Sequence, residues 1–234
     1  MIPARGGSKG IPRKNLAPVA GKPLLYFTAR AAQGSTRLTR TVLSTEDEEV
    51  ATVGRSLGLE VPFLRPVELA TDHAGSSAVA KHALVFAEGQ ERRAYDAVCL
   101  LQPTSPLRTS ADIDAAIQLL EGSDADAVVS LTQVEEPHPL KMMVVNAGVA
   151  QPLLPDRWRE TLRRQELPAA YFLNGAVYCA RRAVLLEKDS FWGTKTLAYV
   201  MPAQRSVNID TPLDLRVAEL MLAPSPIAPI NARP

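Results

Sequence analysis

A loop rich in glycine and in positively charged residues opens the chain, within the segment IPARGGSKGIPRKNL. Its glycines tolerate backbone angles that are closed to other residues, and they allow main-chain N–H groups to approach a ligand closely. Arg5, Lys9, Arg13 and Lys14 supply positive charge along the same loop. This combination predicts a site for a polyanion, and a nucleoside triphosphate is the natural ligand.

The loop matches neither of the two common phosphate motifs. Walker A requires G-x-x-x-x-G-K-[ST] and the dinucleotide fingerprint requires G-x-G-x-x-G, whereas the glycines here are Gly6, Gly7 and Gly10. The helix-compatible run GKPLLY follows the loop directly. A strand, an anion-binding loop and a helix in this order are typical of a nucleotide-binding α/β half-domain.

The run PARGGSKGIPRKN, followed by GKPLL, resembles the start of the acylneuraminate cytidylyltransferases, also called CMP-sialic acid synthetases. The family resemblance extends along nearly the whole chain. It includes the segments LSTED (43–47), LLQPTSPLR (100–108), HPLK (138–141), RQELP (164–168), NGAVY (174–178) and NIDTPLD (208–214). The related Kdo cytidylyltransferases continue the Pro-Ala-Arg start through a different loop, which favours the neuraminate-type branch.

The resemblance implies a fold and a reaction. The fold is a Rossmann-like, mostly parallel sheet with helices on both faces, of the nucleotide-diphospho-sugar transferase type. The reaction is transfer of CMP from CTP to the anomeric hydroxyl of N-acylneuraminate or a related nine-carbon α-keto acid sugar, with release of pyrophosphate. Kdo, legionaminate and pseudaminate remain alternative sugars, and a catalytically weak nucleotide-binding homologue remains an alternative function.

The 234 residues and the formal net charge of +1 favour a single domain without affinity for nucleic acid or membranes. No run approaches the roughly 18 apolar residues of a membrane span, and no leader precedes the loop, so a cytoplasmic protein is expected. We expect the domain to cover residues 1–222, with a lobe at about 134–170 inserted for dimerisation and a disordered, proline-rich tail at 223–234. Cys99 and Cys179 lie in apolar runs and are expected to be buried thiols.

Apolar runs alternate with amphipathic ones, a pattern that favours a sheet covered on both faces. The predicted strands lie near residues 40–45, 96–102, 127–132, 173–179 and 196–201. Thr45 with Glu48 forms a plausible capping box, and Thr211 with Asp214 forms another. A hairpin-like turn is expected at residues 146–148 of the lobe.

The start of the chain raises a question about the first strand. Only Met1 and Ile2 precede Pro3, where members of the resembled family carry several more apolar residues. We expect either that a few residues are absent from this sequence or that the strand is a stub, which would leave neighbouring backbone groups unpaired.

The resemblance places CTP on the opening loop and beside a serine pair. The residues expected to bind the nucleotide are Ala4, Arg5, Gly6, Ser8, Lys9, Arg13, Lys14, Asn15, Ser76 and Ser77. Ser76 and Ser77 are equally plausible as a helix cap. The residues expected to carry catalysis are Arg5, Lys14 and Asp210, because in-line phosphoryl transfer depends on positioning and on charge stabilisation.

Asp210 is the candidate Mg²⁺ ligand, because it closes a strand just before a capped helix. The resembled family carries two aspartates here, spaced Asp-x-Asp, but this chain has Asn208 at the first position. An amide oxygen can still coordinate Mg²⁺ or hold one of its waters, but it brings no negative charge. Mg²⁺ is the expected cofactor.

Several further residues match segments of the family that contact the sugar or the phosphates. They are Gln102, Arg108, Lys141, Arg164, Tyr171 and Asn174. A surface salt bridge is an equally plausible role for Arg108. The family's lobe reaches the active site of a second subunit, so the resemblance implies a homodimer in which Lys141 and Arg164 act in the neighbouring subunit.

Overall fold

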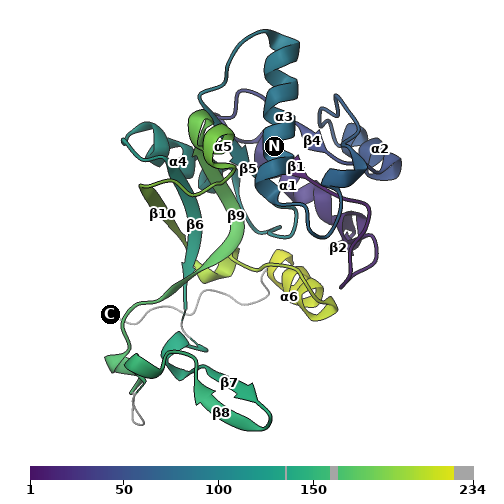
Figure 1. Cartoon of the computed structure of the whole chain (residues 1–234). Coiled ribbons are helices and arrows are strands. Elements are labelled where there is room, and N and C mark those ends of the chain that lie inside the picture. The colour runs from purple at the N-terminus through teal and green to yellow at the C-terminus, as the bar shows by residue number, and fades with distance from the viewer. Residues whose placement is uncertain (135, 159–162, 224–234) are drawn as a thin grey trace, which may run out of the picture.

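The computed structural model describes residues 1–134, 136–158 and 163–223, and Figure 1 shows their arrangement. The strands of this part are β1 (Ile2–Pro3), β2 (Pro18–Val19), β3 (Lys22–Pro23), β4 (Leu43–Ser44), β5 (Ala97–Leu100), β6 (Ala127–Gln133), β7 (Met143–Asn146), β8 (Val149–Pro152), β9 (Tyr171–Arg181) and β10 (Thr196–Met201). Its α-helices are α1 (Leu24–Gln33), α2 (Glu48–Ser56), α3 (Ser76–Glu91), α4 (Ser110–Glu121), α5 (Arg182–Lys188) and α6 (Pro212–Leu222). All five predicted strands are present.

The central sheet has the order β4-β1-β5-β9-β6-β10. β1 pairs with β4 in parallel, and β9 lies between β5 and β6, antiparallel to both. β10 runs parallel to β6. The backbone nitrogen of Met1 donates to Cys99 O and the nitrogen of Leu101 donates to Met1 O, which joins β1 to β5 in the parallel sense. The expected mostly parallel sheet is therefore confirmed, with β9 as the strand that runs against the others.

The short β1 is bonded on both of its sides. Ile2 N donates to Val42 O at 2.8 Å and Ala4 N donates to Ser44 O at 3.0 Å, while Met1 bonds to β5. These bonds correct the expectation that a two-residue strand would leave its neighbours unpaired. β1 thereby places the loop that follows it between the ends of β4 and β5.

Helices cover both faces of the sheet, as Figure 1 shows. On one face α1 and α4 pack on the strands through Leu25, Ile113 and Leu120. On the other face α3 and α5 pack through Leu84 and Leu185. Because the sheet is buried on both sides, its strands are apolar runs rather than alternating ones.

Capping residues fix where two helices near the sheet edge begin. Thr211 and Asp214 form the expected capping box of α6, with Pro212 at the first helical position. The prediction for α2 was wrong by two residues. Its cap is Asp47, whose carboxylate accepts from Val50 N, because Thr45 instead accepts from Asp47 N.

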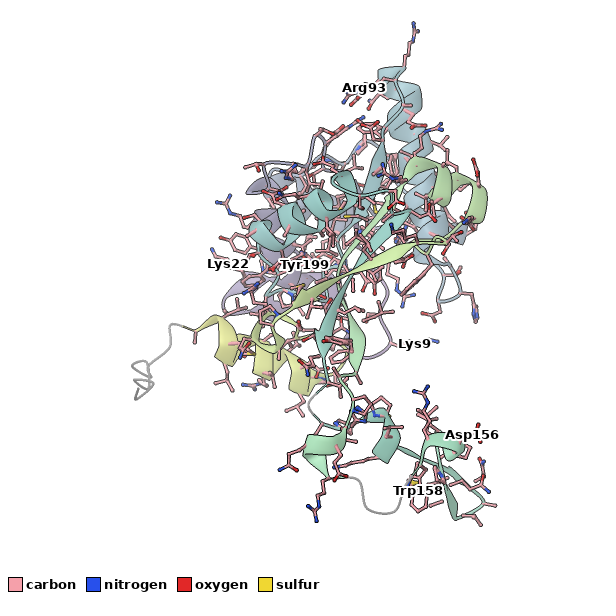
Figure 2. The ribbon with its side chains drawn as sticks, turned by 90° about the vertical axis from the view of Figure 1, so that its left-hand side faces the viewer. Lys9, Lys22, Arg93, Asp156, Trp158 and Tyr199 are labelled. Atoms are coloured by element: carbon pink, nitrogen blue, oxygen red, sulfur yellow. The ribbon has the colours of Figure 1, made fainter. Side chains whose placement is uncertain are left out.

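A lobe separates β6 from β9 and projects from the body of the molecule (Figure 1). β7 and β8 form the expected hairpin, with Ala147 and Gly148 both at positive φ in its turn. Figure 2 shows Asp156 and Trp158 in this lobe, apart from the body. The predicted tail at 223–234 lies, apart from Ala223, outside the described residues.

Both cysteines are buried, as expected, and they face each other across β5 and β9. Among the described helices, none combines the length and the apolar character that a membrane crossing requires.

Candidate functional site

A cavity of about 320 Å³ lies at the edge of the sheet where β1 and β5 end. Its walls come from the opening loop, from the segment before α3 and from the segment after β5. The lining residues are Pro3, Arg5, Gly7, Ser8, Lys14, Asn15, Arg65, Leu69, Thr71, Asp72, Ala74, Ser76, Val79, Gln102, Pro103 and Thr104. Ligands of open α/β sheets bind at this edge, beyond the carboxyl ends of the strands.

The positively charged residues of the loop are each paired with a carboxylate. Arg5 Nη1 lies 2.6 Å from Asp72 Oδ1, and Lys9 Nζ lies 2.8 Å from Asp72 Oδ2. Arg13 contacts both Asp47 and Glu49, at 3.0 and 2.9 Å. These pairs are solvent-accessible, so water weakens them and a multivalent anion can replace the carboxylates.

Asp72 is a cavity residue that the sequence reasoning missed. The ammonium of Lys9 and the guanidinium of Arg5 hold the pKa of its carboxyl below the ordinary value, so it is ionised at neutral pH. Asp72 therefore neutralises the positive charge of Arg5 and Lys9, which would otherwise be available to a ligand. No motif pointed to Asp72, because the sequence does not show which loop folds against the opening one.

Glu46 and Arg65 form a second unexpected element of the site. Glu46 Oε1 accepts from Gly6 N at 2.7 Å, and its other oxygen lies 2.6 Å from Arg65 Nη2. Arg65 is 5% exposed, and its Nε is buried without a hydrogen-bond partner among the described residues. A buried donor on the cavity wall is suited to a ligand acceptor. The position of Glu46 just beyond a parallel strand was the sequence signal that could have revealed it.

Lys14 joins the loop to the segment that precedes α6. Its Nζ donates to Ile209 O at 2.8 Å and to Asp210 Oδ1 at 3.0 Å. The backbone of the loop also packs on Asp210, because a Cβ atom at Gly10 would lie 2.4 Å from Asp210 O. Glycine is therefore required at position 10 for this close approach. The structure thus brings together Lys14 and Asp210, which lie 196 positions apart in the sequence.

Asn208 and Gln102 lie beside the same glycine of β9. A Cβ atom at Gly175 would lie 2.9 Å from Gln102 Oε1 and 3.6 Å from Asn208 Oδ1. The amide nitrogen of Asn208 donates to Asp210 Oδ2 at 2.6 Å. Its Oδ1 is buried and accepts no hydrogen bond from the described residues. This oxygen is an unused acceptor next to the expected metal ligand.

The donors around Asp210 fit a Mg²⁺ ion that is shared with a phosphate chain. No group of three His, Cys, Asp or Glu side chains suited to a metal exists in the described part of the chain. Mg²⁺ is commonly held by one or two carboxylates together with substrate phosphates and waters. One carboxylate, from Asp210, and one unpartnered amide oxygen, from Asn208, match that pattern and not an all-protein cage.

The amino-terminal end of α3 borders the cavity through Ser76. Gly75 is the cap of this helix and no side chain caps it, so the alternative role of Ser76 and Ser77 as a cap is wrong. Ser77 is half-buried. A helix of 16 residues presents free N–H groups at this end, which favours an electronegative ligand.

Other loop residues serve the shape of the site. Asn15 Nδ2 donates to Arg5 O at 2.8 Å, which closes the loop on itself. Ala4 is buried, and its N–H bonds within the sheet. Ser8 lines the cavity with its neighbour Gly7.

Arg108 is a correction to the sequence analysis. It is 3% exposed, so it is not a surface salt bridge, and it does not line the cavity. Its guanidinium donates to Gln102 O, Ala176 O and Thr28 Oγ1 at 3.1, 2.7 and 2.6 Å. Burial lowers its pKa to about 10, so it is still charged at neutral pH. Arg108 therefore holds the backbone of Gln102 in place from behind the site.

Asn174 is a second correction, because it is completely buried. Its Oδ1 accepts from Ser130 Oγ at 2.6 Å, and its Nδ2 donates to Ser206 Oγ at 3.0 Å. Each end of the amide is thus bonded inside the protein. Asn174 supports the bend of β9 next to Gly175 and is not available to a sugar.

The remaining candidates for sugar contacts belong to the lobe or its base and lie away from the cavity lining. Lys141 is exposed and lies 3.6 Å from Glu136. Tyr171 begins β9 and is 46% exposed. The side chain of Arg164 lies outside the described part of the structure.

Comparison with known proteins gives consistent results. A family model described as cytidylyltransferase matches residues 1–205. A pseudaminic acid cytidylyltransferase of Campylobacter jejuni is 32% identical, over 94% of this chain and 94% of its own length. An N-acylneuraminate cytidylyltransferase of Escherichia coli is 33% identical, over 93% of this chain and 50% of its own length.

A solved structure confirms the fold. A CMP:2-keto-3-deoxy-manno-octonic acid synthetase complexed with CTP has a TM-score of 0.69 and 19% identity, covering 94% of this chain and 96% of its own.

Proposed function

The chain belongs to the cytidylyltransferase family, and we propose that it transfers CMP from CTP to N-acylneuraminate or a related nine-carbon α-keto acid sugar. The anomeric oxygen of the sugar attacks the α-phosphorus and forms a new P–O bond. The bond from this phosphorus to the bridging oxygen of the β-phosphate breaks, pyrophosphate leaves, and the hydroxyl proton passes to solvent water. The observation that carries the proposal is the cavity at one edge of the sheet that Arg5, Lys14 and Gln102 line. Asp210 is not part of its lining but is bonded to Lys14 beside it.

The loop and α3 are suited to the nucleotide. Arg65 and Ser76, the first residue of α3, line the cavity together with Arg5 and Ser8. In our proposal the triphosphate replaces Asp72 as the partner of Arg5 and Lys9. Charge-assisted hydrogen bonds from an arginine to a phosphate are stronger than those between neutral groups.

Mg²⁺ is the proposed cofactor, with Asp210 as its carboxylate ligand and Asn208 beside it. When bound, the ion would neutralise charge that develops on the phosphates. Lys14 supplies a second positive charge from the loop, and Arg5 a third. These positive charges would stabilise the negative charge that develops on the departing pyrophosphate.

Gln102 is the proposed sugar contact within the same chain, because it lies on the cavity wall just beyond the end of β5. The lobe is the proposed dimer interface. It exposes large apolar side chains of both hairpin strands, among them Met143, Val145 and Val149 at 46, 65 and 58%. A second copy would cover this face and would bring Lys141 and Arg164 toward the neighbouring cavity.

Release of pyrophosphate from CTP and Mg²⁺ tests the function. The sugar panel contains N-acylneuraminate, pseudaminate, legionaminate and Kdo, because relatives of similar identity, 32 and 33%, are named for different sugars. We expect release with a nine-carbon acid and little with Kdo. Clear binding of CTP without release for any sugar would reject the enzyme function and favour the nucleotide-binding alternative.

The assembly is tested separately by sizing the protein in solution. We expect a dimer that Val145→Asp converts to a monomer with reduced turnover. A strict monomer with full activity would contradict a shared site.

A further inference from the structure

Both carboxylate oxygens of Asp210 are already engaged by the protein. Lys14 Nζ lies 3.0 Å from Oδ1, and Asn208 Nδ2 lies 2.6 Å from Oδ2. The side chain of Lys14 is 15% exposed and that of Asp210 is 66% exposed. The Lys14 ammonium therefore already balances the negative charge of the Asp210 carboxylate. It would also repel a free divalent cation that approached this carboxylate.

The next carboxylate along the chain cannot compensate. Asp214 Oδ2 accepts from the N–H groups of Asp210 and Thr211 and from Thr211 Oγ1, at 3.0, 2.7 and 2.8 Å. These bonds cap α6, so the carboxylate is held away from a metal. Position 208, the other natural place for a carboxylate, carries a neutral amide.

We infer that Asp210 and its described neighbours do not hold a divalent cation by themselves, and that the metal is taken up only together with the triphosphate. The inference rests on the proposed function. The triphosphate draws the Lys14 ammonium away from Asp210, which frees Oδ1, and it also supplies the oxygen ligands that the protein lacks. Lys14 thus couples the two binding events, and Asn208 prevents metal binding in the absence of nucleotide.

Asn208 keeps a second role in the loaded site. Its Nδ2 orients the Asp210 carboxylate, and its buried Oδ1 is free to accept a hydrogen bond. A water bound to the metal or a hydroxyl of the sugar would satisfy this oxygen. An aspartate at 208 would add a charge in the same place and create a nucleotide-independent site.

The test is titration of Mn²⁺ into the purified full chain, with free Mn²⁺ followed by electron paramagnetic resonance, without and with CTP and no sugar. The wild type is expected to bind Mn²⁺ at least tenfold more weakly without CTP than with it, after correction for Mn²⁺ held by CTP alone. Asn208→Asp is expected to tighten binding without CTP at least tenfold. Lys14→Met is expected to tighten it as well, while weakening CTP binding.

Gln118→Glu is the matched control, because it adds the same charge on the exposed face of α4, away from the cavity and from the lobe. Circular dichroism verifies that each variant is folded. Equal Mn²⁺ affinity of the wild type with and without CTP would overturn the inference, and so would unchanged binding in both Asn208→Asp and Lys14→Met. Calorimetry with CTP separates the two proposals, because absence of CTP binding would reject the proposed function and the inference with it.

Discussion

The opening loop and the buried frame behind it use similar residues in opposite ways. The buried frame consists of Arg108, Asp112, Asn174 and the groups they bond. In the loop, Arg5 is paired with a carboxylate at the surface. In the frame, Arg108 is buried and donates to two backbone carbonyls and a hydroxyl.

The difference shows which residues are able to change partners. An ion pair in water has little net strength, so a ligand with several charges can displace one of its members. A buried donor that loses its acceptors has no water to replace them. The loop is therefore suited to binding and the frame to holding position, although both carry arginine.

Asp210→Ala gives the largest expected effect, a fall in turnover of about a thousandfold, because it removes the proposed carboxylate ligand of the Mg²⁺ ion that neutralises the phosphates. The free energy of unfolding should change by less than about 0.5 kcal/mol, because the side chain is largely exposed. Steady-state kinetics and thermal unfolding check both halves. Asp124→Ala, an exposed carboxylate remote from the cavity, is the control and should retain full activity. Near-normal turnover in Asp210→Ala would remove Asp210 from the site.

Arg108→Met and Arg5→Met compare the two regions directly. Arg108→Met should cost about 3–5 kcal/mol of unfolding free energy, because it leaves buried acceptors unpaired. Arg5→Met should change it by less than about 0.5 kcal/mol but weaken CTP binding about 30-fold. Chemical denaturation and calorimetry measure the two quantities. Equal losses of stability in the two variants would contradict the distinction between an exchangeable loop and a fixed buried frame. Arg108→Lys replaces Arg108→Met in this test if the methionine variant does not fold.

Asp112 tests the frame through pH. It is fully buried and accepts from Tyr199 and Arg205, at 2.9 and 2.8 Å. Burial acts to raise the pKa of its carboxyl, but the hydrogen bonds from Arg205 and Thr109 outweigh it and the pKa lies below the ordinary value. Burial and this carboxylate together raise the pKa of Tyr199 to about 12.

Because the folded pKa of Asp112 is lowered, its contribution to stability is complete above the unfolded pKa of about 3.9 and is lost as pH falls through the folded value. Asp112→Asn should therefore cost about 2 kcal/mol at pH 7, and less as the pH drops below about 4. Denaturation at several pH values measures this difference. A cost that stays constant down to pH 3 would show that the charge is unimportant.

Asp72→Asn is expected to have the smallest effect, a gain in CTP affinity of about threefold, because an exposed competing carboxylate is removed. Calorimetry at low and high salt would show the gain shrinking as salt rises. A loss of affinity instead would mean that Asp72 positions the loop or contacts the ligand, and that the surface pairs are not simply exchangeable.

Much of the site was predictable because its signals are local. The glycines and positively charged residues of the loop, the cap at Thr211 and the apolar strands each depend on a few adjacent residues. The rule that parallel strands end together placed Gln102 at this edge. It did not place Asp210, because residues 206–210 form an irregular segment and not the strand that the sequence predicted. Asp72 and Arg65 were missed because their role depends on which loops meet.

The sequence by itself determined the fold class and the loop that carries positive charge, because composition and local spacing are sufficient for these, and the resemblance of its motifs indicated the family. Only the tertiary structure decided the partners. It buried Arg108 and Asn174, which the sequence suggested as sugar contacts, and it paired each of the loop's charged residues with a carboxylate. Burial and pairing depend on distances between segments far apart in the chain, and these distances exist only after folding.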